Sequence, residues 1–122
     1  MKNTVLVIED NEQNLYLVRF LLEKHGLCVY EARDGRQGVT MASELRPDLI
    51  LLDIQLPMLD GYAVAAAIRR DPALRETPII AVTSYAMVGD REKALASGAT
   101  DYIEKPIDPS TFIDQISKYL PR

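Results

Sequence analysis

Three short apolar runs, each closely followed by acidic residues or a lysine, constrain the fold of this chain more than any other feature. Short continuous apolar runs bounded by turn signals are typical of buried parallel strands. In an open sheet of parallel strands, ligands bind beyond the carboxyl ends of the strands. The pattern therefore predicts a binding site as well as a core. The runs and the residues after them are 5–8 with Glu9 and Asp10, 49–52 with Asp53, and 102–103 with Lys105.

The rest of the chain alternates between strand-like and helix-like periodicity, which predicts repeated βα units. Strands are expected at residues 4–8, 28–32, 49–52, 79–82 and 102–104. Helices are expected at 12–25, from 35 to before Pro47, at 61–70, at 88–97 and from 109 to 120, with Asp60 and Asp108 as N-caps. The expected fold class is α/β: a (βα)5 doubly wound parallel sheet with the flavodoxin-like strand order 2-1-3-4-5.

Composition limits the function classes. The chain has 122 residues, of which 48% are hydrophobic and 26% charged, as in an ordinary globular domain. We therefore expect one domain spanning residues 1–122, with no output domain. The formal net charge of −4 disfavours nucleic acid and anionic membranes as partners. No apolar run approaches the ~18 residues of a membrane span, and no signal peptide precedes the first strand, so we expect a cytoplasmic protein.

The expected strand order places the first and third strands side by side, so that Glu9, Asp10 and Asp53 converge. Carboxylates crowded in one place repel one another, and a divalent cation relieves that repulsion. Mg²⁺ suits a site with oxygen ligands, few carboxylates and several retained waters. Two alternatives stay open from the residues alone. Asp10 and Asn11 can instead cap the following helix, and Lys105 can be a solvated lysine in a turn.

Four motifs, in their order and spacing, resemble those of response-regulator receiver domains, and the resemblance covers essentially the whole chain. Within the family the chain is most similar to stand-alone receivers of the DivK type, although receivers inside hybrid histidine kinases share the same features. The resemblance implies a single-domain response regulator of a two-component or phosphorelay system, with a receiver cut from a hybrid histidine kinase as the alternative. The motifs are VIEDN at 7–11, PDLILLD at 47–53 with Pro57 and Asp60-Gly61, AVT at 81–83 and YIEKP at 102–106, and the DivK-like segments are DIQLP at 53–57 and YAM at 85–87.

The resemblance assigns phosphoryl-transfer roles to the residues at the strand ends. By resemblance, Asp53 is the phosphoacceptor, taking a phosphoryl group from a phosphohistidine donor to form an acyl phosphate. Glu9 and Asp10 resemble the metal-holding acidic pair, and Asp53 is also a ligand. Gln55 contributes its backbone carbonyl, which leaves its side chain free to vary, and Lys105 reaches the phosphoryl oxygens as a point charge. The chemistry agrees, because an ionised carboxylate is an adequate nucleophile toward a loose, metaphosphate-like transition state.

Further family positions fall on the last two strands and the loops beside them. Thr83 resembles the residue that hydrogen-bonds the phosphoryl group, and Tyr102 resembles the aromatic switch residue that turns inward with it. Alternatively, Thr83 is only a β-branched residue that favours a strand, and Tyr102 packs on an edge of the sheet with its hydroxyl in contact with solvent. The resemblance also implies a cis bond before Pro106. Gln55 and Tyr85 flank the expected path of the hydrolytic water, so we expect them to influence the phosphorylated lifetime.

The first helix offers a docking surface. Residues at helical spacing are expected to face the sheet, which leaves Tyr16 and Phe20 together on the solvent side. Receivers generally meet their kinases through this helix, so we expect the pair to contact a sensor histidine kinase or a histidine phosphotransfer protein, while a downstream protein target binds elsewhere. The alternative is that scattered exposed apolar residues are normal. The residues expected to face the sheet are Asn14, Leu17, Val18, Leu21 and Leu22.

Two rival functions come from other classes. A small Mg²⁺-dependent phosphatase of related topology needs a further acid/base aspartate just after the nucleophile, whereas position 55 is Gln. A flavodoxin-type electron carrier needs a phosphate-binding loop after the first strand, and none follows it here. We therefore expect no enzyme activity beyond the chain's own phosphorylation and dephosphorylation. Asp53, Lys105 and Thr83 are the expected participants, with Mg²⁺ as the cofactor.

Overall fold

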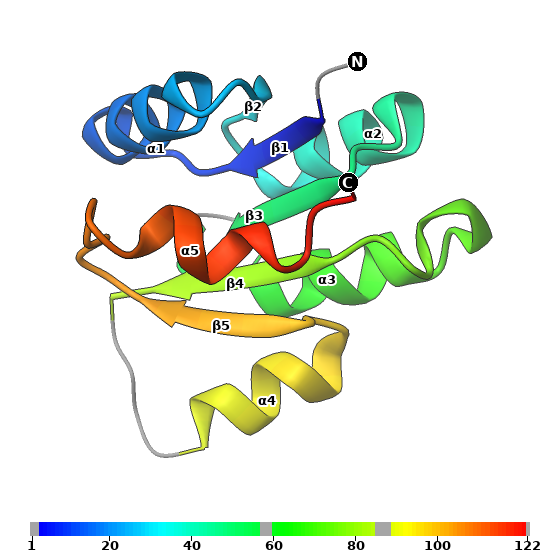
Figure 1. Ribbon diagram of the computed structural model, residues 1–122. Helices are drawn as coiled ribbons and strands as arrows, with labels where there is room; N and C mark the ends of the chain where they lie inside the picture. Colours follow the sequence, from blue (N-terminus) through cyan, green and yellow to red (C-terminus); the bar gives the residue numbers. More distant parts are fainter. Residues whose placement is uncertain (1–2, 57–59, 85–88, 122) are drawn as a thin grey trace.

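The computed structural model describes residues 3–56, 60–84 and 89–121, and these form one parallel sheet flanked by helices (Figure 1). The strand order is β2-β1-β3-β4-β5, and every neighbouring pair is parallel. This confirms the predicted α/β class and the flavodoxin-like order. The strands are β1 (Thr4–Ile8), β2 (Cys28–Ala32), β3 (Leu49–Asp53), β4 (Ile79–Thr83) and β5 (Asp101–Glu104).

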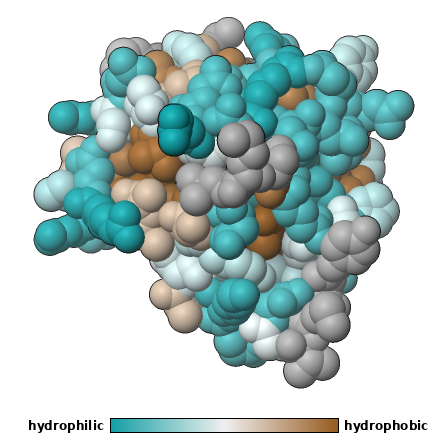
Figure 2. All heavy atoms as spheres, turned by 180° about the vertical axis from the view of Figure 1, so that it is seen from behind, coloured by the Kyte–Doolittle hydropathy of each residue, from teal (hydrophilic) through white to brown (hydrophobic). Residues whose placement is uncertain are grey.

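Helices cover both faces of the sheet. Two of them, α1 (Glu12–Lys24) and α5 (Phe112–Ser117), lie on one face (Figure 1). The others lie on the opposite face, where the surface is mostly hydrophilic and hydrophobic side chains show in only a few places (Figure 2). No helix in the described ranges is long and apolar enough to span a membrane. The helices of the second face are α2 (Gly35–Leu45), α3 (Gly61–Arg69) and α4 (Asp90–Ser97), with a short 3₁₀ helix η1 (Pro72–Leu74) after α3.

The core consists of two apolar clusters, one on each face of the sheet. Every residue of β3 and β4 is buried, because a parallel sheet covered on both faces has no solvent-facing side. On one face Leu22 of α1 and Phe112 of α5 are fully buried against the strands. On the other face Val64 and Ile68 of α3 pack in the same way. The central strands β3 and β4 are therefore apolar along their length, with Asp53 and Thr83 as their last residues.

Three helices begin at a side chain that caps them, and one of these caps is the predicted Asp60. The side chains of Asn11, Asp34 and Asp60 each accept a hydrogen bond from the backbone N–H three residues later, at 2.8–3.0 Å. Gly61 then lets α3 start close against the end of β3. A Cβ atom there would lie 2.4 Å from the Cα of Ile54, so only glycine fits without a backbone shift. The start of α3 is thereby fixed beside the residues that follow Asp53.

The last helix begins later than the sequence predicts. We expected Asp108 to cap a helix with Pro109 in its first turn, whereas α5 begins at Phe112. The carboxylate of Asp108 instead accepts hydrogen bonds from the backbone N–H and the hydroxyl of Ser110, at 2.9 and 2.7 Å. The carbonyl of Asp108 also accepts from the N–H groups of Thr111 and Phe112, at 3.1 and 2.9 Å, and these bonds close a turn before α5. The predicted N-cap at Asp108 is therefore wrong.

Strands β1 and β2 have the predicted bounds, and where other ends differ they do so by one to three residues, which is common at frayed ends. β3, β4 and β5 each have one more residue than predicted, and η1 was not predicted. α5 ends at Ser117 rather than at Leu120, because the chain beyond it continues in tighter bonds between residues three apart. The predicted start of the fourth helix, Val88, lies outside the described residues.

Arg69 at the end of α3 joins several segments through its guanidinium group. It donates to four backbone carbonyls and one hydroxyl, which together fix the ends of α3, η1, α4 and β4 relative to one another. The planar five-donor fork of arginine suits this arrangement, whereas the single ammonium of lysine does not. The acceptors are Gly98 O at 2.9 Å, Leu74 O at 2.7 Å, Arg75 O at 3.2 Å, Thr77 O at 2.6 Å and Thr100 Oγ1 at 3.3 Å.

Arg69→Lys should destabilise the fold without removing a positive charge. We expect the free energy of unfolding in urea to fall by about 1–3 kcal/mol, because several carbonyls lose their donor. Arg70→Lys is the matched control, since the neighbouring side chain is exposed. Equal stability of the two variants would contradict this role for Arg69.

Candidate functional site

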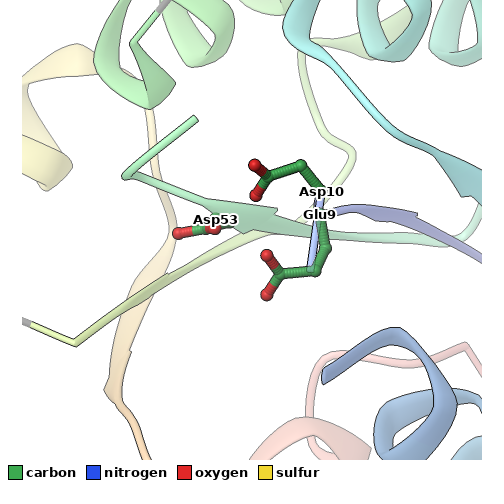
Figure 3. A group of neighbouring side chains, drawn as sticks. All are labelled: Glu9, Asp10 and Asp53. Atoms are coloured by element: carbon green, nitrogen blue, oxygen red, sulfur yellow. The ribbon is translucent and has the colours of Figure 1, made fainter. Parts of the chain in front are cut away.

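The carboxyl ends of β1 and β3 bring three acidic side chains together (Figure 3). Ile8 pairs with Leu52 in the ladder, so the residues that follow, Glu9 and Asp53, are neighbours across the two strands. Glu9 is 5% and Asp53 is 4% exposed, whereas Asp10 is exposed. Carboxylate oxygens of the three residues lie within 4.8 Å of one another. The predicted convergence is confirmed.

Lys105 completes this cluster from the end of β5. Its ammonium lies 2.7 Å from Oε1 of Glu9 and 3.5 Å from Oδ2 of Asp53, and only 11% of the side chain is exposed. The backbone N–H of Lys105 donates to the carbonyl of Thr83 at 2.7 Å, which anchors the residue beside β4. The bond before Pro106 is cis, as the resemblance implies. The alternative of a solvated lysine in a turn is wrong.

Burial changes the acid strength of Glu9. Desolvation, together with the neighbouring carboxylate of Asp53, raises the pKa of Glu9 to about 7, although Lys105 opposes the shift. One lysine thus leaves the crowded carboxylates incompletely compensated. The site has an unmet requirement for positive charge near neutral pH.

The donor set fits a hard divalent cation. All three side chains offer carboxylate oxygens, their oxygens are close enough to share one ion, and one of the three is open to solvent. Magnesium is bound in this manner, through one or two carboxylates and retained waters. Glu9, Asp10 and Asp53 are the residues that can hold it.

Of the two residues that could alternatively cap α1, Asp10 and Asn11, the structure shows that Asn11 is the cap. Asn11 caps α1 by accepting a hydrogen bond from the N–H of Asn14 at 3.0 Å. Glu9 also accepts from the N–H of Asn11 at 3.3 Å, but its other oxygen faces Lys105. Asp10 is therefore not needed for capping, and its carboxylate belongs to the acidic cluster.

Gln55 contacts the site in a way that the sequence does not reveal. Its backbone N–H donates to Oδ1 of Asp53 at 2.9 Å, so Oδ2 is the oxygen that faces Lys105. Its side-chain oxygen accepts a hydrogen bond from the backbone N–H of Ser84, also at 2.9 Å. The resemblance leaves the identity of the side chain at position 55 open, and the structure shows that this glutamine binds Ser84.

The two predicted switch residues lie on neighbouring strands. Thr83 ends β4 and is 2% exposed. Tyr102 on β5 is half-buried, and its hydroxyl is buried without a hydrogen-bond partner among the described residues. The alternative of a tyrosine with a wet hydroxyl is therefore wrong. Burial also raises the pKa of Tyr102 above its ordinary value.

The predicted docking pair lies on the exposed side of α1. Tyr16 is 74% and Phe20 is 52% exposed. The opposite side packs on the sheet as expected, and Leu15 joins it although the sequence analysis did not include that residue. Tyr85, expected to influence the phosphorylated lifetime, lies outside the described residues.

A small cavity of about 20 Å³ lies between the acidic cluster and the face covered by α1 and α5. Glu9, Asp53 and Lys105 form its polar side, and Asn14 of α1 also lines it. Ile107 and Phe112 close its apolar side. The sequence gives no local signal for these last two residues, because only the packing of α5 on the sheet brings them there.

Comparison with known proteins agrees with this geometry. The sequence profile of the response regulator receiver domain matches residues 5–117. The chain belongs to the response regulator receiver domain family. It is 44% identical over 120 residues to the polar-differentiation response regulator DivK of Brucella anthropi, with 98% of each chain covered.

Solved structures of receivers have the same fold. The receiver domain of sensor histidine kinase PA1611 from Pseudomonas aeruginosa, with a magnesium ion coordinated in its active site cleft, is 36% identical with a TM-score of 0.90, and 98% of each chain is covered. The chemotaxis protein CheY4 of Vibrio cholerae is 28% identical with a TM-score of 0.93, covering 98% of this chain and 100% of that one. The predicted resemblance to receivers, and to DivK among them, is confirmed.

The raised pKa of Glu9 predicts a pH-dependent cost to stability in divalent-free buffer. The folded protein binds the Glu9 proton up to about pH 7, whereas the unfolded chain releases it near 4.5. The contribution of this group therefore falls as pH rises from about 4.5 to about 7, and it stays low above that range. Glu9→Gln should gain stability relative to wild type across this window, by an amount on the order of 1–3 kcal/mol at pH 7.5.

Urea unfolding of both proteins at several pH values, in the presence of a chelator, measures this difference. Glu44→Gln on the exposed part of α2 is the control. A difference between the Glu9 variant and wild type that does not change between pH 4.5 and 7.5 would contradict the assigned pKa.

Proposed function

We propose that this receiver accepts a phosphoryl group from a phosphohistidine onto Asp53 and then binds partners through its altered surface. The observation that carries the proposal is the position of the Asp53 carboxylate, buried at the end of β3 and flanked by an ammonium and two further carboxylates. The profile match over most of the chain supports the same reaction class. We propose that it works as a single-domain regulator of residues 1–122 in the cytoplasm.

In this reaction an oxygen of Asp53 forms a bond to phosphorus while the bond between phosphorus and the donor imidazole nitrogen breaks. Oδ2 is the oxygen suited to attack, because Oδ1 already accepts the N–H of Gln55. Lys105, 3.5 Å from Oδ2, neutralises charge on the transferred group. Thr83, at the end of the neighbouring strand, donates its hydroxyl to a phosphoryl oxygen. Transfer of this kind depends on positioning and charge compensation more than on a strong base.

We propose Mg²⁺ as the cofactor, held by Glu9, Asp10, Asp53 and the backbone carbonyl of Gln55. When bound, it supplies the positive charge that the crowded carboxylates and the phosphoryl oxygens require. The PA1611 receiver, which carries magnesium in its active site cleft, supports this assignment. Two features of the site agree with this assignment. The carboxylate oxygens of the three residues lie within 4.8 Å of one another, and the pKa of Glu9 is raised when no cation is present.

The alternatives have less support. The phosphatase alternative lacks an acid/base aspartate at position 55, where the Gln side chain is bonded to Ser84. A receiver cut from a hybrid kinase undergoes the same reaction on Asp53, so this alternative differs only in the larger protein to which the domain belongs. The stand-alone assignment is favoured because the match to DivK covers 98% of that protein. We propose no reaction beyond the chain's own phosphorylation and dephosphorylation, and Gln55 and Tyr85 remain predicted influences on its lifetime.

Asp53→Asn should remove phosphorylation while leaving the fold intact, because the amide is close in shape but lacks the nucleophilic oxygen. Labelling with acetyl phosphate, or with a phosphorylated histidine kinase, is expected to fall below detection. Asp48→Asn is a matched control, since this aspartate lies at the opposite end of the sheet and bonds to Thr4.

Chelation tests the cofactor in the same assay, where excess chelator should stop labelling and Mg²⁺ should restore it. Acid-labile phosphate on the folded Asp53→Asn protein would falsify the acceptor assignment. Undiminished labelling in excess chelator would contradict the role of Mg²⁺ and leave the acceptor in place.

We also propose that the exposed pair Tyr16 and Phe20 docks the protein that carries the donor histidine, either a sensor histidine kinase or a histidine phosphotransfer protein. The two rings are four residues apart on α1, the helix that follows Glu9 and Asp10. Adjacent exposed aromatic side chains are suited to burial against a partner. We propose that the downstream protein target binds a different surface, and that neither nucleic acid nor a membrane is a partner.

Tyr16→Ala combined with Phe20→Ala should slow phosphotransfer from the kinase on the order of tenfold or more, since buried interface aromatics often contribute over 1 kcal/mol each. Labelling by acetyl phosphate should be unchanged, because the small donor needs no docking. Tyr30→Ala, an exposed aromatic on β2, is the control. Equal loss with both donors would show that the pair supports the fold, and no loss with either would remove the docking role.

A further inference from the structure

The side chain of Gln55 connects two segments that meet at the site. Its oxygen accepts the backbone N–H of Ser84 at 2.9 Å, and its own backbone N–H is bonded to Asp53. One residue thus contacts the acceptor carboxylate with its main chain and the residue after β4 with its carboxamide. Neither the sequence pattern nor the proposed metal role of its carbonyl requires that second contact.

The hydrogen bond between Gln55 and Ser84 lies where the ladder between β3 and β4 would otherwise continue. Asp53 pairs with Val82, and the N–H of Ile54 donates to the carbonyl of Val82 at 3.0 Å. In a regular parallel ladder the next bond would run from the N–H of Ser84 to the carbonyl of Ile54. That carbonyl instead accepts the N–H of Gly61, at 3.0 Å, where α3 begins. The carboxamide of Gln55 therefore replaces a missing rung between β3 and β4.

The segment held in this way includes a proposed participant in the reaction. Ser84 directly follows Thr83, whose carbonyl accepts the backbone N–H of Lys105 at 2.7 Å. The backbone at 83–84 is thus bonded on one side to the lysine at the end of β5 and on the other side to Gln55. A change at Gln55 is transmitted to Thr83 through a single peptide unit.

We propose that Gln55 is a positioning residue whose carboxamide ties Ser84 to the loop after β3 in the unphosphorylated protein and releases it when a phosphoryl group occupies Asp53. This rests on the proposed acceptor role of Asp53. A phosphoryl group brings three charged oxygens to the ends of β3 and β4, and charged acceptors bind N–H groups more strongly than a neutral amide oxygen does. The phosphoryl oxygens compete with the carboxamide for the N–H of Ser84, and the released segment carries Thr83 with it.

The first experiment observes the tie directly, without any phosphoryl group. Nuclear magnetic resonance detects the scalar coupling across a hydrogen bond, here between the amide nitrogen of Ser84 and the side-chain carbonyl carbon of Gln55. We expect the coupling in the wild-type protein and its absence in Gln55→Met, which keeps the length of the side chain but has no oxygen acceptor. Absence of the coupling in the unphosphorylated wild type would overturn the proposal.

The second experiment measures the link to the acceptor with beryllofluoride, a phosphoryl mimic, and Mg²⁺. Binding should remove the coupling in wild type. Gln55→Met has no bond to break, so it should bind the mimic roughly twofold to tenfold more tightly, the range expected for one net hydrogen bond. Gln115→Met on the exposed side of α5 is the matched control and should bind like wild type.

The outcomes separate the tie from the acceptor role. If the mimic binds, and either the coupling persists or wild type and Gln55→Met bind it equally well, Gln55 is only structural and the proposal is wrong. If the mimic does not bind wild type at all, the acceptor role of Asp53 fails, and with it the release step. In that case the first experiment still decides whether the tie exists. A tighter-binding Gln55→Met with unaltered Gln115→Met supports the proposal.

Discussion

The ammonium of Lys105, placed between the buried carboxylates of Glu9 and Asp53, is the interaction on which the site depends. Removing these charges from water is costly, and the ammonium, 2.7 Å from one carboxylate and 3.5 Å from the other, offsets part of that cost. Glu9 and Lys105 are 96 positions apart in the sequence. The interaction therefore exists only when β1, β3 and β5 are all in place, which makes the acidic site a product of the completed sheet.

The apolar character of the sheet explains why these charges are confined to one end. The central strands β1, β3 and β4 are covered on both faces, so a charged side chain in their interior would be buried without a partner. At the carboxyl ends the ladder stops, and backbone and side-chain polar groups become available. Gly61 and Gln55 show how closely packed this end is. Gly61 allows α3 to approach Ile54, and the side chain of Gln55 replaces the ladder hydrogen bond between β3 and β4 that this approach removes.

The incomplete compensation of the carboxylates is also what makes the site responsive. Burial and the neighbouring carboxylate of Asp53 leave the pKa of Glu9 raised despite Lys105, which fits the proposed binding of a cation. A phosphoryl group adds negative charge at the same place, and it draws on the same positive groups. The proposed metal binding, the proposed phosphoryl transfer and the proposed movement of the 83–84 segment all involve the same few donors and acceptors.

Much of this protein was determined by the sequence itself. Short apolar runs and their periodicity predicted all five strands, the strand order and the edge of the sheet where Glu9, Asp10, Asp53 and Lys105 meet, because these depend on local pattern and on the few topologies open to βα units. Local pattern gave the wrong start for the last helix, because a turn closed by Asp108 precedes α5. Only the tertiary structure decided that Lys105 is buried, that Glu9 has a raised pKa and that Gln55 binds Ser84. Each of these depends on distances between segments far apart in the chain, and those distances do not follow from the residue types alone.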